Sequence, residues 1–408
     1  METVDAVSHS WVHPKERKSI LTPINGRKWP VPIPSDITLN RVRVELLNLG
    51  RQVVWLDVLC LWQEGVPADD DQRLEQWKLD VPTIGNIYQP SESLRPPTVV
   101  TYFNGLGRVF RISKLDDERH WLNRAWTLQE FNSRGIIGGV AQGSFPPRVD
   151  NKGRIIASDP NVLRFYQRLE AASNNSCMRS NVVLSVLGAM GSRNAAHVVD
   201  KVGGVTHILA LERITTYHRS EVHTAAEDAW NLLIPVMGKN NRADLFFFYP
   251  ARGSGKHAWC PSWDQVNNSL PPAPPFALDG TVQYDEDSSS FCCTGWLIEE
   301  CTVQGLAKPD PKHHCRTGAL RVVRDGTEHS FTVTAHHQEP IPDGKYALIG
   351  ERSSSGHGVV VWAVGTLSSE HLFEKLSVLR TEDKSDTENI FELKLIAWAR
   401  DRRDIQLV

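Results

Sequence analysis

The 408-residue sequence lacks a long uninterrupted apolar run. The longest, Val53–Trp62 (VVWLDVLCLW), has ten residues and contains an aspartate. A helix that spans a bilayer needs about 20 mostly apolar residues, so we expect no membrane-spanning segment. The first residues, METVDAVSHSW, also lack the basic and apolar regions of a signal peptide, and we expect none.

The sequence also has no large excess of charge and few cysteines. A net charge of −3 gives no electrostatic attraction to nucleic acid or to an anionic membrane, so neither is expected as a partner. Seven cysteines, an odd number spread over a long chain, indicate reduced thiols. We therefore expect a cytoplasmic protein.

Several chemical signatures are missing. The sequence contains no GxGxxG, GxSxG or HExxH motif, so a hydride-transferring Rossmann site, a hydrolase nucleophile elbow and a zinc-protease helix have no support. One group of cysteines and histidines has no paired CxxC spacing, and we expect ordinary strand residues there rather than a metal site; it comprises Cys292, Cys293, Cys301 and His313–Cys315. No cofactor is expected.

The first 145 residues alternate between strand patterns and helix patterns. Such alternation predicts an α/β domain with a parallel sheet, helices on both faces, and ligands at the carboxyl ends of the strands. Strands are expected at 5–11, 52–62, 97–105 and 135–139. Helices are expected at 35–50 (capped by Ser35 or Asp36, closed by Gly50), 71–89 (broken near Pro82) and 116–135 (capped by Ser113 or Asp116).

The rest of the chain divides into two regions by its pattern. Residues 146–270 are predicted to be mainly helical, with helices at 161–172, 181–190, 202–214 and 227–239. After a proline-rich loop at 271–275, residues 271–408 are predicted to form a β-rich domain. Its strands are expected at 301–307, 319–324, 330–337, 345–352, 358–367, 373–380 and 392–399.

The stretch NRAWTLQEF (Asn123–Phe131) carries the main candidate for chemistry. On the predicted helix, Trp126 and Glu130 share a face, and a carboxylate beside an indole is partly desolvated, which raises its pKa. The alternative is a surface glutamate near the carboxyl end of a helix, a position that the helix dipole disfavours.

Other polar residues allow both structural and functional interpretations. Arg124 could clamp a phosphate or a carboxylate, or could pair with Asp57 or with the acidic loop at 69–71. Asp57 lies in an apolar strand pattern and needs a partner, which could be protein or ligand. At the end of the first strand, Ser8, His9 and Ser10 could bind a ribose or phosphate, although His9 could also cap or pack. Gln63 and Gln129 are polar candidates of the same kind.

Four blocks, in order along the chain, resemble the signature of the fungal heterokaryon-incompatibility (HET) domain. The resemblance covers Asp5 to Gly139, and the later WCPSW (Trp259–Trp263) is similar to a motif found downstream of many such domains. Three features depart from the signature. His9 stands in place of the usual tyrosine, Leu61-Trp62 replace the usual isoleucine and asparagine or aspartate, and the glycine often found after the first tryptophan is absent, since WVHP follows. The blocks are AVSHSW, VVWLDVLCLWQ, IGNIYQ and NRAWTLQE.

The resemblance implies a TIR/flavodoxin-like sheet and a role in non-self recognition and programmed cell death. HET domains are regarded as remote relatives of TIR domains, and enzymatic TIR domains cleave the nicotinamide–ribose bond of NAD with a glutamate four residues after a tryptophan. Trp126 and Glu130 match that spacing. The resemblance thus implies that NAD is a substrate and that Glu130 is the catalytic residue. The substrate-binding residues would be Ser8, His9, Trp11, Asp57, Arg124 and Trp126.

Two other functions stay open at this point. One is a non-catalytic signalling module that self-associates or binds a protein partner. The other is a HET fold recruited to unrelated metabolic chemistry, because a fold does not determine a function.

Overall fold

The computed structural model of the chain divides into two compact units. They are formed by Met1–Met178 with Ala189–Ala229, and by Arg179–Gly188 with Trp230–Val408. Residues of the expected helical region, 146–270, therefore occur in both units. The structure describes residues 4–65, 70–89, 97–112, 114–131, 135–140, 148–149, 155–156, 159–177, 182–209, 224–310, 312–354, 359–382 and 403–408. Within these ranges, no helix is long and apolar enough to cross a membrane.

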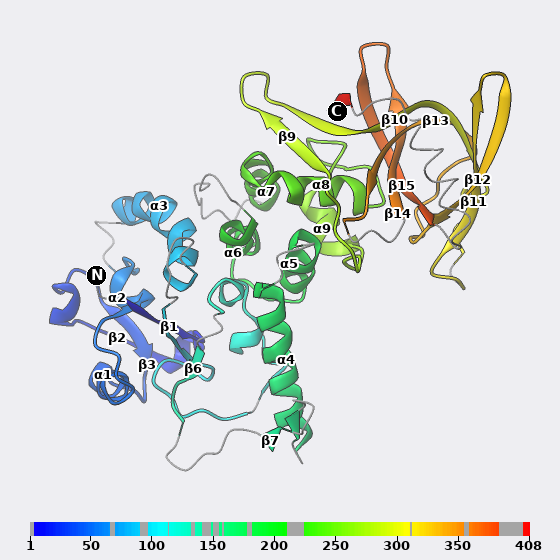
Figure 1. Ribbon diagram of the computed structural model, residues 1–408. Helices are drawn as coiled ribbons and strands as arrows, with labels where there is room; N and C mark the ends of the chain where they lie inside the picture. Colours follow the sequence, from blue (N-terminus) through cyan, green and yellow to red (C-terminus); the bar gives the residue numbers. More distant parts are fainter. Residues whose placement is uncertain are drawn as a thin grey trace. The chain divides into compact units, whose positions relative to one another are not determined.

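The first unit is built on a four-stranded parallel sheet (Figure 1). The strand order is β4 (Val54–Leu56), β1 (Asp5–His9), β5 (Val99–Tyr102) and β6 (Gly135–Ile137). The chain passes from β1 to its neighbour β4, and then crosses back to β5 on the other side of β1. The expected parallel sheet is confirmed, and its strand order reverses between β1 and β5.

Helices cover both faces of this sheet. On one face, Val7 of β1 packs with Val42 and Leu46 of α1 (Leu39–Asn48). On the other face, Ala6 packs with Tyr88 of α3 (Asp70–Tyr88). Successive residues of a strand point to opposite faces, so the adjacent Ala6 and Val7 anchor the two helix layers.

The ends of α1 agree in part with the sequence. Gly50 has φ of +73° and follows the last turn, as expected of a glycine at a helix end. The expected cap at Ser35 or Asp36 is wrong: the side chain of Thr38 caps the helix by accepting a hydrogen bond from Arg41 N. A threonine immediately before the first helical residue fulfils the same role as serine or aspartate.

The strand expected at 52–62 is much shorter in the structure. β4 ends at Leu56, and Asp57 begins the one-turn helix α2 (Asp57–Cys60). The Asp57 carboxylate accepts a hydrogen bond from Val58 N at 2.7 Å, which favours a turn at that point. The apolar run therefore contains a strand end, and Asp57 lies beyond it rather than inside it.

The helix expected at 116–135 is wrong. The chain instead forms two short 3₁₀ helices, η4 (Trp121–Asn123) and η5 (Trp126–Leu128), and Gly135 begins β6. His120, not Asp116, caps η4, and Ser113 lies outside the described residues. Side chains of this segment satisfy the backbone in place of helical hydrogen bonds: the amide of Asn123 donates to Leu115 O and to Asp117 O.

The break expected near Pro82 is also wrong. α3 continues through this proline, although an interior proline removes one helical hydrogen bond. Val81 and Pro82 are buried, and Val81 packs in a cluster with Val199. This packing offsets the lost bond, and tertiary contacts commonly override local propensity in this way.

The remaining elements agree with the predicted pattern in part, because the short elements at 14–34, 148–149 and 155–156 and the helices at 239–248 and 263–269 were not expected. Helices are confirmed within 146–270, where α5 and α7 contain residues of both units. The helices are α4 (Pro160–Cys177), α5 (Val182–Gly191), α6 (Val199–Leu209), α7 (Ala225–Val236), α8 (Lys239–Phe248) and α9 (Trp263–Ser269). Short elements of the first unit are η1 (Pro14–Glu16), β2 (Arg17–Ile20), η2 (Pro23–Asn25), β3 (Val31–Pro34), β7 (Arg148–Val149) and β8 (Ile155–Ile156).

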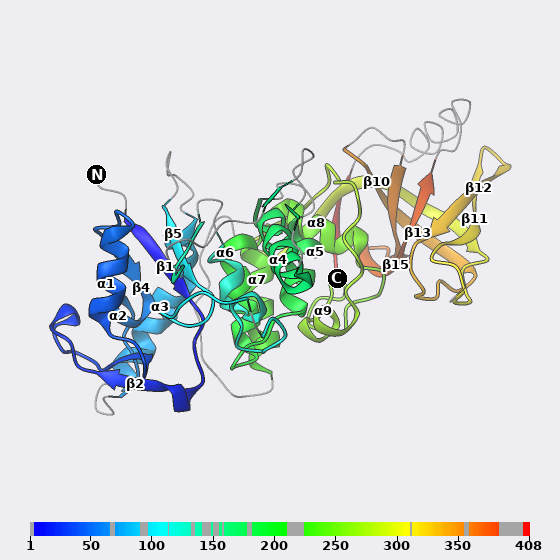
Figure 2. The same ribbon diagram turned by 90° about the horizontal axis from the view of Figure 1, so that it is seen from below.

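The second unit contains a large, mainly antiparallel sheet, as expected for the C-terminal region. The path β11-β12-β15-β14-β13-β10-β16 also has a β10–β11 pairing, which closes six of the strands into a ring. Helix α8 packs against β9 and β14 (Figure 1). Figure 2 shows β10, β11, β12, β13 and β15 of this sheet from below. The strands are β9 (Thr281–Asp285), β10 (Ser290–Gln304), β11 (Arg316–Arg324), β12 (Thr327–Ala335), β13 (Gly344–Arg352), β14 (Val359–Leu367), β15 (Leu372–Glu382) and β16 (Arg403–Leu407).

Some predictions for this unit need correction. β9 and β16 were not expected, and the strand expected at 392–399 lies outside the described residues. Cys292, Cys293 and Cys301 are strand residues of β10, as predicted. His313–Cys315 precede β11 and are not strand residues.

Candidate active site

At the sheet of the first unit, the Ser8 hydroxyl forms hydrogen bonds with both Trp121 and Glu130. Its hydroxyl donates a hydrogen bond of 2.5 Å to Glu130 Oε2 and accepts one of 2.6 Å from Trp121 Nε1. β1 presents Ser8, and the segment around the two 3₁₀ helices presents both partners. Two of the predicted residues, Ser8 and Glu130, therefore lie in direct contact.

The environment of Glu130 changes its protonation. Its side chain is half-buried. The pKa of Glu130 is raised from 4.5 to about 7, with burial as the largest cause. The Ser8 hydrogen bond and the charges of His9 and Arg124 oppose this rise, and the charge of Asp57 adds to it. A carboxyl group with a pKa near neutrality can exchange a proton at physiological pH, as general acids and bases do.

His9, Trp11 and Asp57 form a second contact group beside the first. His9 Nε2 lies 2.8 Å from Asp57 Oδ1, and Trp11 Nε1 donates to Asp57 Oδ2 at 3.1 Å. The ring of His9 stacks on that of Trp11 at 5.8 Å between centroids. The partner that Asp57 requires is thus His9, supported by an indole and a backbone amide.

The attraction between His9 and Asp57 shifts the pKa of each residue toward its charged form. Burial alone would lower the pKa of His9, but the charge and hydrogen bond of Asp57 raise it above 6.5. Burial alone would raise the pKa of Asp57, but the charge and hydrogen bond of His9 hold it below 3.8. At near-neutral pH the geometry favours a charged pair. The negative Asp57 then disfavours ionisation of Glu130.

Arg124 lies near Glu130 but does not pair with Asp57, whose oxygens are taken by His9, Trp11 and Val58 N. Burial lowers the pKa of Arg124, while the charge of Glu130 opposes that effect. Within the described ranges, the Arg124 guanidinium makes no ion pair. The expected ion pair with Asp57 is therefore wrong. Of the acidic loop, Asp70 and Asp71 make no ion pair with Arg124 within the described residues, and Asp69 lies outside them.

Two further arginines were missed by the sequence analysis. Arg17 lies over the ring of Trp11 at 5.1 Å. The charges of Arg119 and Arg124 help to lower the pKa of Arg17, after burial as the main cause. Like charges disfavour one another at this range, so the three side chains form a region of positive potential beside Trp11. Nothing in the spacing of Arg17 and Arg119 along the chain indicated this convergence.

The segment that carries Glu130 is held by Thr127 and Arg193. Thr127 Oγ1 lies 2.6 Å from Trp121 O and 2.8 Å from Arg124 O, and its one proton is shared between these two acceptors. Arg193 Nη1 donates to Thr127 Oγ1 and to Arg124 O, both at 2.7 Å. Burial lowers the pKa of Arg193 to about 10, so the guanidinium stays charged at neutral pH. These bonds fix the turns that bring Glu130 to Ser8.

Trp126 does not occupy the predicted position. It packs against the cluster of Val81 and Val199, and the tryptophan linked to Glu130 through Ser8 is Trp121. Because Trp126 and Glu130 do not share an α-helix, the argument from a common helix face does not hold. The block HWLNR just before the WTLQE motif was a signal that could have directed attention to Trp121.

The two glutamine candidates have different environments. Gln63 donates to Leu61 O at 2.9 Å and supports the backbone after α2. Gln129 is only 1% exposed, and neither polar atom of its side chain has a hydrogen-bond partner within the described residues. Gln63 is structural, whereas Gln129 retains unsatisfied hydrogen-bonding capacity beside Glu130.

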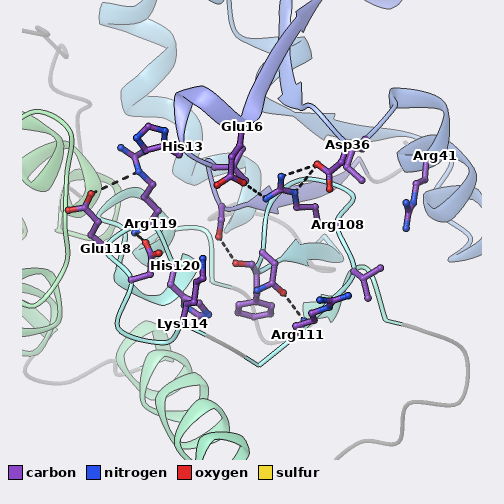
Figure 3. A pocket seen from close by; sticks show the side chains of 17 residues that line it. His13, Glu16, Asp36, Arg41, Arg108, Arg111, Lys114, Glu118, Arg119 and His120 are labelled. Atoms are coloured by element: carbon purple, nitrogen blue, oxygen red, sulfur yellow. Dashed lines mark hydrogen bonds and ion pairs between the residues drawn. The ribbon is translucent and has the colours of Figure 1, made fainter.

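A cavity of about 830 Å³ lies at the carboxyl ends of β1 and β5 (Figure 3). Ser10 follows β1, and Phe103 and Asn104 follow β5. Glu130 and Asp57 do not line this cavity. The lining residues are Ser10, Val12, His13, Glu16, Asp36, Ile37, Arg41, Phe103, Asn104, Arg108, Val109, Arg111, Lys114, Asp117, Glu118, Arg119 and His120.

Metal chemistry and known relatives give no further assignment. No group of three or more histidine, cysteine, aspartate or glutamate side chains that could hold a metal occurs in the described portion of the chain. No family model, no curated protein and no solved structure matches this chain.

Proposed function

We propose that this chain is a HET-domain protein of fungal non-self recognition whose first unit is TIR-like and hydrolyses NAD at the nicotinamide–ribose bond. The strand order supports the TIR/flavodoxin-like part of the proposal. Taken in chain order, the parallel strands lie in the order 2-1-3-4, which is the beginning of the flavodoxin-like order 2-1-3-4-5.

The observation that carries the proposal is the half-buried Glu130 carboxyl held by Ser8, with its pKa raised to about 7. Cleavage of a glycosidic bond passes through a state with positive charge on the sugar, which a nearby carboxylate stabilises. Nicotinamide leaves NAD as a neutral molecule and needs no protonation. Water then supplies the hydroxyl group at the ribose and releases a proton, which gives nicotinamide and ADP-ribose.

A direct test is nicotinamide release from NAD by the purified full chain. We expect turnover by the wild type and loss of it in Glu130→Gln, because the amide keeps the shape of the carboxylate and loses its charge. Glu170→Gln is a matched control, since Glu170 is an exposed glutamate of α4 in the same unit. Wild-type protein that releases no nicotinamide, even when concentrated to favour assembly, would rule out the enzymatic part of the proposal.

A second candidate is a non-catalytic signalling module, and one observation favours it. The cavity at the carboxyl ends of the strands is not lined by Glu130. On this hypothesis the RAWTLQE segment is scaffold or interface. The hydrogen bonds from Trp121 to Ser8 and from Ser8 to Glu130 then only hold a glutamate with a structural role. Absence of nicotinamide release together with measurable self-association of the purified chain would support the module.

A further inference from the structure

The cavity at β1 and β5 lies where the strand order of the parallel sheet reverses. Ser10, Phe103 and Asn104, which directly follow these two strands, line it. In open α/β sheets, the crevice outside the carboxyl ends of two strands at such a reversal is the usual position of a ligand. The cavity volume of about 830 Å³ falls in the range of small-molecule sites.

The acidic side chains of the cavity wall are largely engaged by protein groups. Arg108 pairs with Glu16 Oε2 at 2.8 Å and with Asp36 Oδ1 at 2.9 Å. Asp117 accepts a hydrogen bond of 2.9 Å from Arg119 N, and Glu118 lies 4.0 Å from the Arg119 guanidinium. The charges of Glu16 and Asp36 are therefore neutralised locally by Arg108.

Cations without such partners remain around the same cavity. Arg41, Arg111 and Lys114 make no ion pair with any described residue. Figure 3 shows Arg41 and Arg111 toward one side of the cavity and Lys114 with Arg119 toward the other. A ligand that engages both sides needs more than one anionic group.

His120 supplies an independent indication of a missing acceptor. Its side chain is buried at 5% exposure and lines the cavity. Burial lowers its pKa to about 4, so the ring is neutral at pH 7. Nδ1 accepts from Leu122 N at 3.3 Å, which places the proton on Nε2. That Nε2–H donor has no hydrogen-bond partner in the described chain, although buried donors are normally paired.

We propose that this cavity is a binding site for a small molecule that carries a diphosphate group, of the nucleoside diphosphate class. Arg41, Arg111 and Lys114 bind the phosphate oxygens, since guanidinium groups match the geometry of phosphate. The volume left beyond a diphosphate accommodates the nucleoside beside the apolar wall of Val12, Ile37 and Val109. The site goes beyond the proposed NAD hydrolysis, because Glu130 takes no part in it.

The test is calorimetric titration of the full chain with ADP, inorganic pyrophosphate and adenosine at low and at physiological salt. We expect binding of ADP and of pyrophosphate that weakens as salt rises, and no binding of adenosine alone. The double variant Arg111→Ala/Lys114→Ala should bind ADP about tenfold more weakly or worse, because it loses two charge-assisted contacts.

The control is Lys28→Ala/Arg43→Ala, which removes two exposed positive charges of the same unit that do not line the cavity. It should bind ADP within about twofold of the wild type, as should Glu130→Gln, whether or not NAD is hydrolysed. Melting curves check that each variant is folded. Wild-type protein that binds neither ADP nor pyrophosphate, or equal weakening by the two double variants, would overturn the proposal.

Discussion

Ser8 Oγ lies between Trp121 Nε1 at 2.6 Å and Glu130 Oε2 at 2.5 Å, accepting from the indole and donating to the carboxylate. This chain of two hydrogen bonds fixes the direction of the Ser8 proton, because the indole can only donate. Ser8 therefore stabilises the ionised form of Glu130 against the burial that raises its pKa. The chemistry proposed for Glu130 depends on this balance.

Replacement of Ser8 by alanine should raise the pKa of Glu130 above its value of about 7, since the hydrogen bond that lowers it is lost. The midpoint of the pH profile of nicotinamide release should move to higher pH. Stability should fall by about 1–3 kcal/mol, because Trp121 Nε1 loses its acceptor. Ser10→Ala is the control on the same strand end, where the hydroxyl bonds Phe103 O instead. An unchanged midpoint in Ser8→Ala would show that the hydrogen bond from Ser8 does not lower the pKa of Glu130.

Asp57→Asn should destabilise the first unit by about 2 kcal/mol, because it weakens the contacts to His9 and Trp11. The pKa of His9 is higher in the folded protein than the ordinary 6.5. The stability that this gives is fully present below pH 6.5 and is lost as the pH rises through the pKa that His9 has in the folded protein. The pKa of Asp57 is lower in the folded protein than the ordinary 3.8. The stability that this gives is present above pH 3.8 and is lost as the pH falls through the pKa that Asp57 has in the folded protein.

The difference in unfolding free energy between wild type and Asp57→Asn should therefore be largest between about pH 4 and pH 6.5. Urea unfolding across this range measures it. A difference that does not change with pH would contradict a charged pair in the folded state.

Thr127→Val should destabilise the segment that carries Glu130. The hydroxyl bonds Trp121 O and Arg124 O and accepts from the buried Arg193, so valine leaves these groups with fewer partners. We expect a loss of about 2–3 kcal/mol in chemical unfolding. Thr83→Val is a useful control, since that hydroxyl makes one exposed bond to Asp80 O. Equal losses in both variants would argue against a specific role for Thr127.

Lys375 of β15 should make the stability of the second unit increase as the pH rises above 7. Its side chain is 1% exposed, and Nζ donates to Tyr249 O at 2.8 Å. Burial lowers its pKa from 10.5 to about 7. Between these two pKa values the unfolded chain holds more protons than the folded chain, so stability should rise with pH, by at most about 5 kcal/mol. Lys375→Met should flatten this rise in urea unfolding, whereas the exposed Lys308→Met should keep it.

The sequence predicted the sheet of the first unit well, because its signals are local. Val99–Tyr102 is a short, mainly apolar strand that is buried on both faces, and apolar runs of this length indicate such strands. The second unit was also recognisable, since turns separate its strands at short intervals. These features depend on neighbouring residues in the chain.

The segment around Glu130 could not be predicted from its own residues. The apolar spacing and cap candidates of 116–135 favour a helix, but Asn194 accepts from Ala125 N and donates to Asn123 O. These bonds come from a residue about 70 positions away, and no local pattern encodes them. The partners of Asp57 were missed for the same reason, because His9 and Asp57 meet only when β1 and β4 pair.

The central claim is that the Glu130 carboxylate acts on the ribose of NAD. The most direct measurement is nicotinamide release from NAD between pH 5 and pH 9 by wild type and by Glu130→Gln. The account predicts wild-type activity that rises through a midpoint at about pH 7, where Glu130 ionises, and no such activity in the variant. Equal release by both proteins across the range would contradict it.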